Sequence, residues 1–107
     1  MASFDVNALV VIHNESENRF EVSLGGPLAL ATYRLREGSM IINHTEVPPP
    51  FEGLGIAAKI TRAALDYARA HHLKVVPSCP YTAAFLRKHA EYHDLLSLED
   101  KQRFLGF

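Results

Sequence analysis

The sequence predicts a mixed α/β (α+β) fold in which an antiparallel meander of strands leads into a β-α-β unit. Three observations carry this prediction. Apolar and polar residues alternate over 19–24 and again over 28–36, as they do in strands that have one face in water. After Gly55 the apolar residues recur at helical spacing instead. A short run at 73–77 then returns as a strand.

Four strands are expected before Gly55, and short polar or glycine-rich turns separate them. They cover residues 9–12, 19–24, 28–36 and 39–47. Turns this short join neighbouring strands that run in opposite directions. The four strands are therefore expected to form an antiparallel meander.

The second half of the chain is expected to alternate helices with one strand. A helix runs from Gly55 to about Ala70, with charged residues on one side and apolar residues on the other. Pro77 and Pro80 end the strand that follows it. A second helix over 81–89 comes next, and Ser97 is a suitable N-cap for a last helical segment. A mixed sheet of about five strands, with the last two parallel across the helix, is therefore expected.

The composition limits the kinds of partner. Eleven Lys and Arg residues stand against twelve Asp and Glu residues, so the near-zero charge predicts no attraction to nucleic acid or to a membrane surface. The chain is expected to be one domain, 1–107. Its only cysteine, Cys79, has no partner for an internal disulfide, and a cytoplasmic location is expected. No metal site is expected, since His89 and His93 lack a third ligand at suitable spacing.

The stretch 48–60, PPPFEGLGIAAKI, joins the fourth strand to the long helix. Glycines ahead of a helix N-terminus expose backbone N–H groups and let a phosphate approach them, so this junction is predicted to bind an anion. Gly53–Ala58 also satisfies the dinucleotide pattern G-x-G-x-x-[GA]. The acidic residue expected about 20 positions later is missing, however, where 73–76 reads LKVV. A nucleotide P-loop is excluded, because no lysine and hydroxyl pair follows Gly55.

Two linked motifs make the interpretation more specific. The first is G-L-G-I-A at Gly53–Ala57, and the second is P-S-C-P-Y at Pro77–Tyr81, with H-A-E-Y following at 89–92. Together they resemble the small, minimal branch of the GCN5-related N-acetyltransferases (GNAT), in which G-x-G-I-A is followed by P-x-C-P-[FY]. The resemblance covers residues 41–96. It implies a minimal GNAT fold whose last two parallel strands splay apart, without the helices that larger members insert between their first two strands.

The resemblance implies that acetyl-coenzyme A (acetyl-CoA) binds along the fourth strand and the start of the long helix. Backbone N–H groups over 54–58 would hold its pyrophosphate, and 45–47 would line its pantetheine arm. The cofactor-binding residues expected from the resemblance are Thr45, Val47, Gly53, Leu54, Gly55, Ile56, Ala57, Ala58, Phe85, Lys88 and His89. Two departures reduce the expected affinity, because Glu52 and Leu54 stand where the family often has basic residues.

The same resemblance implies that an amine attacks the thioester directly, with help from a general base and an acid. His44 and Glu46 are the candidate bases, because alternate residues of a strand share a face. Cys79 ends the strand after the helix, where it could accept the acetyl group or protonate the departing thiolate. A lone buried cysteine is also a common apolar filler. Tyr81 adjoins Cys79 and is a second candidate acid.

The expected function is therefore transfer of an acetyl group from acetyl-CoA to an amine of a small molecule or a protein. A lysine side chain, a polyamine and an amino sugar are all compatible acceptors. The alternative is a non-catalytic module that binds CoA or acyl-CoA, and a third possibility is an interaction domain whose glycine loop binds nothing. A monomer or a weak homodimer is expected.

Overall fold

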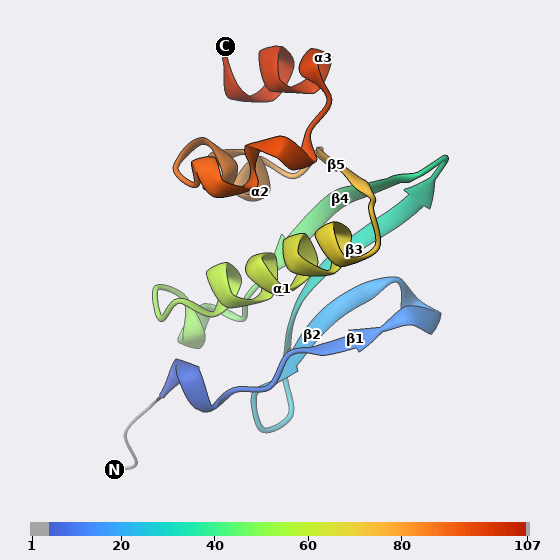
Figure 1. Ribbon diagram of the computed structural model, residues 1–107. Helices are drawn as coiled ribbons and strands as arrows, with labels where there is room; N and C mark the ends of the chain where they lie inside the picture. The colour runs from blue at the N-terminus through green and yellow to red at the C-terminus, as the bar shows by residue number, and fades with distance from the viewer. Residues whose placement is uncertain (1–4, 107) are drawn as a thin grey trace.

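The computed structural model describes residues 5–106, in which one mixed sheet is crossed by a long helix (Figure 1). The strands lie in the order β1-β2-β3-β4-β5 and comprise Ile12–Asn14 (β1), Arg19–Ser23 (β2), Leu28–Arg36 (β3), Ser39–Glu46 (β4) and Lys74–Pro77 (β5). Neighbours from β1 to β4 pair antiparallel, whereas β4 and β5 pair parallel. The predicted α+β fold, a meander followed by a β-α-β unit, is confirmed.

The helices follow the predicted order. The long helix α1 spans Ile56–Ala70, and α2, Pro80–Arg87, follows β5 directly. At the start of α3, Leu98–Asp100, the Ser97 hydroxyl accepts a hydrogen bond from the Asp100 amide at 3.1 Å, as the predicted N-cap should. Short 3-10 segments and one π segment complete the chain at Val6–Ala8, Glu15–Glu17, Pro49–Phe51, Ala90–Leu95 and Lys101–Leu105. Within residues 5–106, every helix is too short or too polar to cross a membrane.

The first strand begins later than predicted. β1 starts at Ile12, so the predicted strand 9–12 overlaps it only at its last residue. Leu9 instead closes the first 3-10 turn, where its N–H donates to the Val6 carbonyl at 3.2 Å. Val10 follows with its side chain 68% exposed. The β-branched run favoured a strand. The Leu9 N–H, however, is already bonded within the 3-10 turn and cannot pair with a neighbouring strand.

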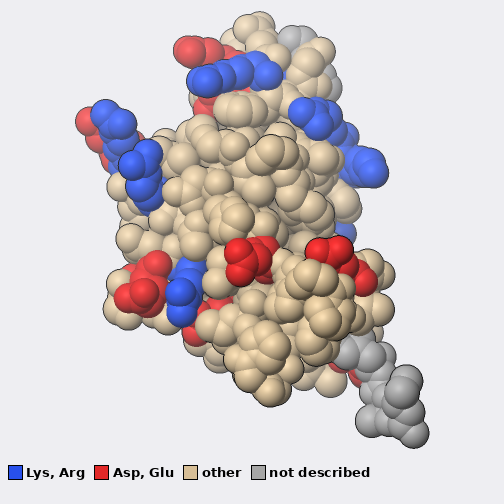
Figure 2. Space-filling model, turned by 180° about the vertical axis from the view of Figure 1, so that it is seen from behind, with Lys and Arg blue, Asp and Glu red and all other residues tan. Residues whose placement is uncertain are grey.

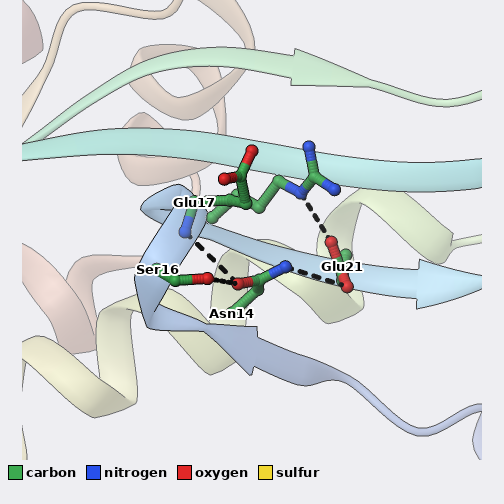
Figure 3. A network of polar contacts seen from close by, with 5 residues as sticks. Asn14, Ser16, Glu17 and Glu21 are labelled. Carbon is green, nitrogen blue, oxygen red and sulfur yellow. Dashed lines mark hydrogen bonds and ion pairs between the residues drawn. The ribbon is translucent and has the colours of Figure 1, made fainter.

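A small polar network fixes the short connection between β1 and β2 (Figure 3). The Asn14 side-chain oxygen accepts hydrogen bonds from the Ser16 hydroxyl at 3.0 Å and from the Glu17 amide at 3.2 Å. Its amide nitrogen donates to Glu21 at 3.5 Å, and Arg19 pairs with the other oxygen of that carboxylate at 2.6 Å. One asparagine thus ties the turn to the next strand. The connection between β1 and β2 is a single 3-10 turn, Glu15–Glu17, as expected for a chain without the helices that larger GNAT proteins insert there.

The core lies between α1 and the sheet face that it covers, which we call the inner face. Its members alternate along the strands and recur at helical spacing on α1. They are Phe20, Val22, Ala29, Ala31, Tyr33, Met40, Ile42 and Val75 from the sheet, and Ile56, Ile60, Ala64, Leu65 and Ala68 from α1. Burying each large aliphatic side chain here contributes about 1.5–3 kcal/mol. This packing holds the start of α1 beside the end of β4.

The opposite sheet face, which we call the outer face, is far more exposed. By alternation it carries side chains that are partly or fully exposed, among them Ile12, Asn14, Leu30, Thr32, Ile41, Asn43 and Val76. Figure 2 shows the molecule from behind, with a broad area free of Lys, Arg, Asp and Glu that charged side chains border. The sheet therefore has one face in the core and one face open to other molecules.

Candidate active site

The helix α1 begins on glycine, as predicted. Gly55 is its N-cap in the left-handed region (φ +88°), and Gly53 just before it has φ +77°. Among the described residues, a Cβ at Gly53 would meet nothing within 4 Å, and one at Gly55 would meet only the Val6 side chain at 4.0 Å. The first intrahelical bond runs from the Lys59 amide to the Gly55 carbonyl at 3.1 Å, which leaves the amides of 56–58 without helical partners. This end of α1 is suited to an anion.

A cavity of about 210 Å³, which we call the cradle cavity, opens beside this helix end. Its lining comes from the end of β4, the glycine loop, the first turn of α1 and the start of α2. The residues are Val47, Phe51, Glu52, Gly53, Gly55, Ile56, Ala57, Ala58 and Tyr81. Seven of these were predicted as site residues, whereas Phe51 was not singled out. Leu54, which was predicted, lies outside the lining and is 41% exposed.

β4 and β5 part next to the cradle cavity. Their parallel pairing ends where Ile42 lies opposite Pro77, and the Cys79 amide then donates to the Ile42 carbonyl at 3.0 Å. Pro77 has no N–H to extend the ladder, and Pro80 occupies the first position of α2. β4 continues to Glu46 beyond its last pair with β5. The two parallel strands therefore splay, as predicted.

An irregularity in β4 changes the order in which its residues face the two sides. Thr32 of β3 pairs with His44, whereas the next residue, Tyr33, pairs with Ile42. Asn43 is therefore an extra residue in β4, which is a β-bulge. The Thr32 hydroxyl donates a hydrogen bond to the Asn43 side chain, so both point to the outer face.

After the bulge, the predicted catalytic residues separate onto the two faces of β4. Thr45 pairs with buried Ala31 and so faces inward, where its hydroxyl oxygen lies 3.5 Å from the Cys79 sulfur. His44 and Glu46 face outward, joined by a 3.2 Å contact between Nε2 and Oε1, and their side chains are 58% and 60% exposed. They share a face, as predicted, but that face is not the one beside Cys79.

Cys79 itself is 5% exposed and is the N-cap of α2. Burial raises the pKa of its thiol, but the Thr45 hydroxyl, the amides of Thr82 and Tyr81 and the Thr82 hydroxyl favour the thiolate and lower the pKa by more. The pKa therefore lies below its ordinary value. Tyr81 differs, because burial raises the pKa of its phenol, which the charge of Arg62 lowers only in part. At neutral pH Tyr81 is a proton donor, while Cys79 is more acidic than an ordinary thiol.

A second cavity of about 250 Å³ lies between α1 and α2 and shares Ala58 and Tyr81 with the cradle cavity. Its other lining residues are Arg62, Ala84, Phe85, Lys88 and His89. The guanidinium of Arg62 lies 5.3 Å from the centre of the Phe85 ring, and the His89 ring stacks on the same ring with centroids 3.9 Å apart. The structure thus brings three predicted cofactor-binding residues, Phe85, Lys88 and His89, into the lining of one cavity.

Sequence reasoning missed two residues of this region, Arg62 and Thr82. Arg62 is one of the charged residues that helical spacing puts on one side of α1, yet it stands one turn after Ala58 and so continues the cradle along the helix. Thr82 carried no signal in the sequence beyond its place three residues after Cys79. Within residues 5–106 we find no group of three His, Cys, Asp or Glu side chains arranged to hold a metal.

The fold and this site define a class of protein. The sequence model of the GCN5-related N-acetyl-transferase family matches residues 19–95, which is most of the chain. The protein therefore belongs to this family. The matched range includes the four longer strands, α1, α2 and both cavities.

Individual relatives are more distant. Protein NATD1 of Mus musculus is 33% identical over 82 residues, which cover 73% of this chain and 74% of that protein. Protein NATD1 of Xenopus tropicalis is 29% identical over 85 residues, which cover 77% and 78%. The solution structure of a GCN5-like putative N-acetyltransferase from Staphylococcus aureus matches with a TM-score of 0.64 and 28% identity, over 83% of this chain and 88% of that one. The fold of this chain is therefore that of a GNAT protein.

Proposed function

We propose that this protein transfers an acetyl group from acetyl-CoA to an amine. The observation that carries the proposal is the position of the cradle cavity. It begins at the open N-terminus of α1 and reaches Tyr81, two residues after Cys79, where β4 and β5 part. The anion-binding helix end and Tyr81 therefore border the same volume, and Cys79 lies two residues before Tyr81, just outside the lining. The linked motifs at Gly53–Ala57 and Pro77–Tyr81 support assignment to the minimal GNAT branch.

The residues present fit acetyl-CoA in three respects. The amides of 56–58 and the two bare glycines suit a pyrophosphate, since the space where the glycine side chains would stand is open among the described residues. Val47, Phe51 and Ile56 provide an apolar wall for a thioester arm. Arg62 and Lys88 in the second cavity suit a further phosphate. When bound, acetyl-CoA supplies an acetyl group activated as a thioester.

The proposed base and acid lie on opposite faces of β4. His44 faces outward with Glu46 beside it, so an amine that approaches the outer face can pass its proton to this pair. Glu46 contacts one nitrogen of the imidazole at 3.2 Å and so orients the ring. Cys79 and Tyr81 stand on the inner side, where the departing thiol group is expected. Backbone amides near the splay are the donors for the developing oxyanion.

A non-catalytic CoA-binding module is the second candidate, and one observation favours it. His44 and Glu46 are both well exposed and on the opposite face of β4 from Cys79, which leaves the general base outside the closed part of the site. Glu52, in the cradle lining, also opposes an anion.

Incubation with acetyl-CoA separates these candidates. We expect acetyl-CoA to raise the melting temperature, and a panel containing a lysine derivative, a polyamine and an amino sugar to yield at least one acetylated amine by mass spectrometry. A thermal shift with no acetylated product would support the binding module. No shift at millimolar acetyl-CoA would reject both.

A further inference from the structure

The described part of the chain buries two polar side chains, Thr61 and Thr82, and only one of them is satisfied. The Thr61 hydroxyl donates to the Ala57 carbonyl at 2.8 Å. Thr82 is fully buried, and its hydroxyl makes no hydrogen bond of acceptable geometry within residues 5–106. A buried hydroxyl without a partner costs about 1–3 kcal/mol, so its retention calls for an explanation.

The surroundings of Thr82 indicate what its hydroxyl is for. Cys79 is the N-cap of α2 and Pro80 its first residue, and the first intrahelical bond runs from the Ala83 amide to the Cys79 carbonyl at 3.1 Å. The amides of Tyr81 and Thr82 therefore lie at the two positions that face an N-cap side chain. Thr45 approaches the sulfur from β4, at 3.5 Å. Two elements of structure, α2 and β4, thus place polar groups around one sulfur atom.

We propose that Thr82 is a positioning residue whose hydroxyl donates to the Cys79 thiolate, and that Cys79 is consequently a thiolate site for soft electrophiles such as a thioester carbonyl. While Cys79 holds its proton, the Thr82 hydroxyl has no well-formed bond. When the proton leaves, the sulfur becomes an acceptor for both threonine hydroxyls and for the two amides. The unsatisfied group in the thiol form becomes a satisfied group in the thiolate form.

The charges around Cys79 agree with this assignment. The polar groups around the sulfur lower the pKa of its thiol despite burial, which acts the other way. Tyr81 on α2 is the neighbouring titratable group, and it carries no charge at neutral pH because its pKa is raised. The charge of Arg62 on α1 acts on Tyr81, and His44 and Glu46 lie on the outer face of β4. No carboxylate among the described residues contributes to the pKa of Cys79.

A thiolate at this position favours one of the two chemical roles open to Cys79 under the proposed function, on which this step rests. A thiolate cannot protonate a leaving group, but it can attack a thioester carbonyl carbon. Attack forms a bond from Sγ to that carbon and breaks the bond from the carbon to the thioester sulfur, which leaves as a thiolate. No oxidant or reductant is consumed, and the acyl group is held on Cys79 for a second transfer.

The thiolate itself is tested without acetyl-CoA, so that its failure is distinct from failure of the proposed function. Cys79 is the only cysteine, and its alkylation by iodoacetamide can be followed by intact mass from pH 5 to pH 10. In Thr82→Val we expect the alkylation profile to move to higher pH and the rate at pH 7 to fall roughly tenfold, the value of one hydrogen bond to a charged group. Thr82→Ser, which keeps the hydroxyl, should restore most of the rate.

Thr61→Val is the matched control, because it removes the other buried threonine hydroxyl on a neighbouring helix. It should leave the alkylation profile of Cys79 unchanged. Stability provides a second readout: removing an unsatisfied hydroxyl should keep or raise the melting temperature in Thr82→Val. The proposal is overturned if Thr82→Val alkylates like the unaltered protein, if Thr61→Val slows alkylation equally, or if reactivity and melting temperature fall together in Thr82→Val.

Discussion

The two helices that border the site begin with the same kind of first hydrogen bond but with different N-cap residues. Gly55 is in the left-handed region at φ +88°, whereas Cys79 is extended at φ −83°. In α1 the first intrahelical bond ends on the carbonyl of Gly55, and in α2 it ends on the carbonyl of Cys79, at 3.1 Å in both. Gly55 has open space where a side chain would be, whereas Cys79 fills its own helix end with a buried sulfur. Both ends expose amides and the positive end of a helix dipole.

This difference shows that a helix N-terminus can stabilise negative charge in two ways. A helix end without a side chain is available to an anion from outside, while a helix end with a thiol stabilises an anion that the protein makes itself. Tyr81 lines both cavities and follows Cys79 by two residues, so the two helix ends act on neighbouring parts of one site. Substitutions at each helix end separate their effects.

The largest effect is expected at the open helix end. Gly55→Glu puts a carboxylate into the space in front of the α1 amides, and the thermal shift produced by acetyl-CoA should disappear, with affinity reduced by roughly a hundredfold or more. Gly38→Glu is the matched control, because Gly38 has a similar positive φ (+80°) and open space but lies in the turn between β3 and β4. If Gly55→Glu keeps the full shift, the cradle is not the cofactor site.

Removal of the sulfur should affect transfer and spare binding. In Cys79→Ala we expect the rate of amine acetylation to fall by about a hundredfold, because a positioned nucleophile or proton donor contributes factors of that size. The thermal shift with acetyl-CoA should remain, since the α1 amides are intact. Equal loss of binding and transfer would mean that the two helix ends do not have separate roles.

A smaller effect is expected along α1. Arg62→Ala should weaken acetyl-CoA binding by roughly tenfold and reduce its salt dependence, since Arg62 lines the cavity next to the cradle. Arg69→Ala is a matched control, because Arg69 lies in the last turn of α1, away from the cradle. Each arginine lies 5.3 Å from the centre of an aromatic ring and pairs with a carboxylate of the 90–95 segment. Calorimetric titration of both variants measures the difference, and equal weakening would remove Arg62 from the site.

The smallest effect concerns the dependence of stability on pH. This dependence must be distinguished from the titration of Cys79. His13 bonds the Tyr33 hydroxyl and stacks on Phe20 at 4.1 Å. Burial lowers its pKa from the usual 6.5; the charge of Glu15 raises the pKa by less, and His71 lowers it further. The folded state therefore binds this proton less readily than the unfolded state, and stability is lost as pH falls below 6.5 towards the folded pKa.

We accordingly expect His13→Phe to flatten the decline in melting temperature between pH 7.5 and pH 5, by about a few degrees. His72→Gln, which removes an exposed histidine, should leave the decline unchanged. Alkylation of Cys79 in the His13→Phe background then reports the thiol without the pH-dependent change in stability that His13 contributes. A decline that is the same in His13→Phe and in the unaltered protein would place the pH response elsewhere.

Local patterns in the sequence were sufficient for most of the fold. Strand alternation predicted the meander, glycine predicted the start of α1, and two prolines predicted the end of β5, because each of these signals acts on residues near it in the chain. The prediction was wrong at 9–12, where a 3-10 turn took the start of the strand. The spacing of apolar residues and the residue types in a turn do not show whether a backbone N–H, such as that of Leu9, bonds within a turn or to a neighbouring strand.

The grouping of the site residues, in contrast, was decided by tertiary structure. A bulge at Asn43 turned His44 and Glu46 to the outer face and Thr45 to the inner face, although the three are consecutive or alternate in the sequence. Contact between Thr45 and Cys79 depends on the parallel pairing of β4 with β5, and Arg62 enters the site only because α2 packs beside α1. The sequence alone determined where each element begins and what its ends can bind. Only the packed sheet decided which side chains meet, because register and bulges are set by pairing between distant segments.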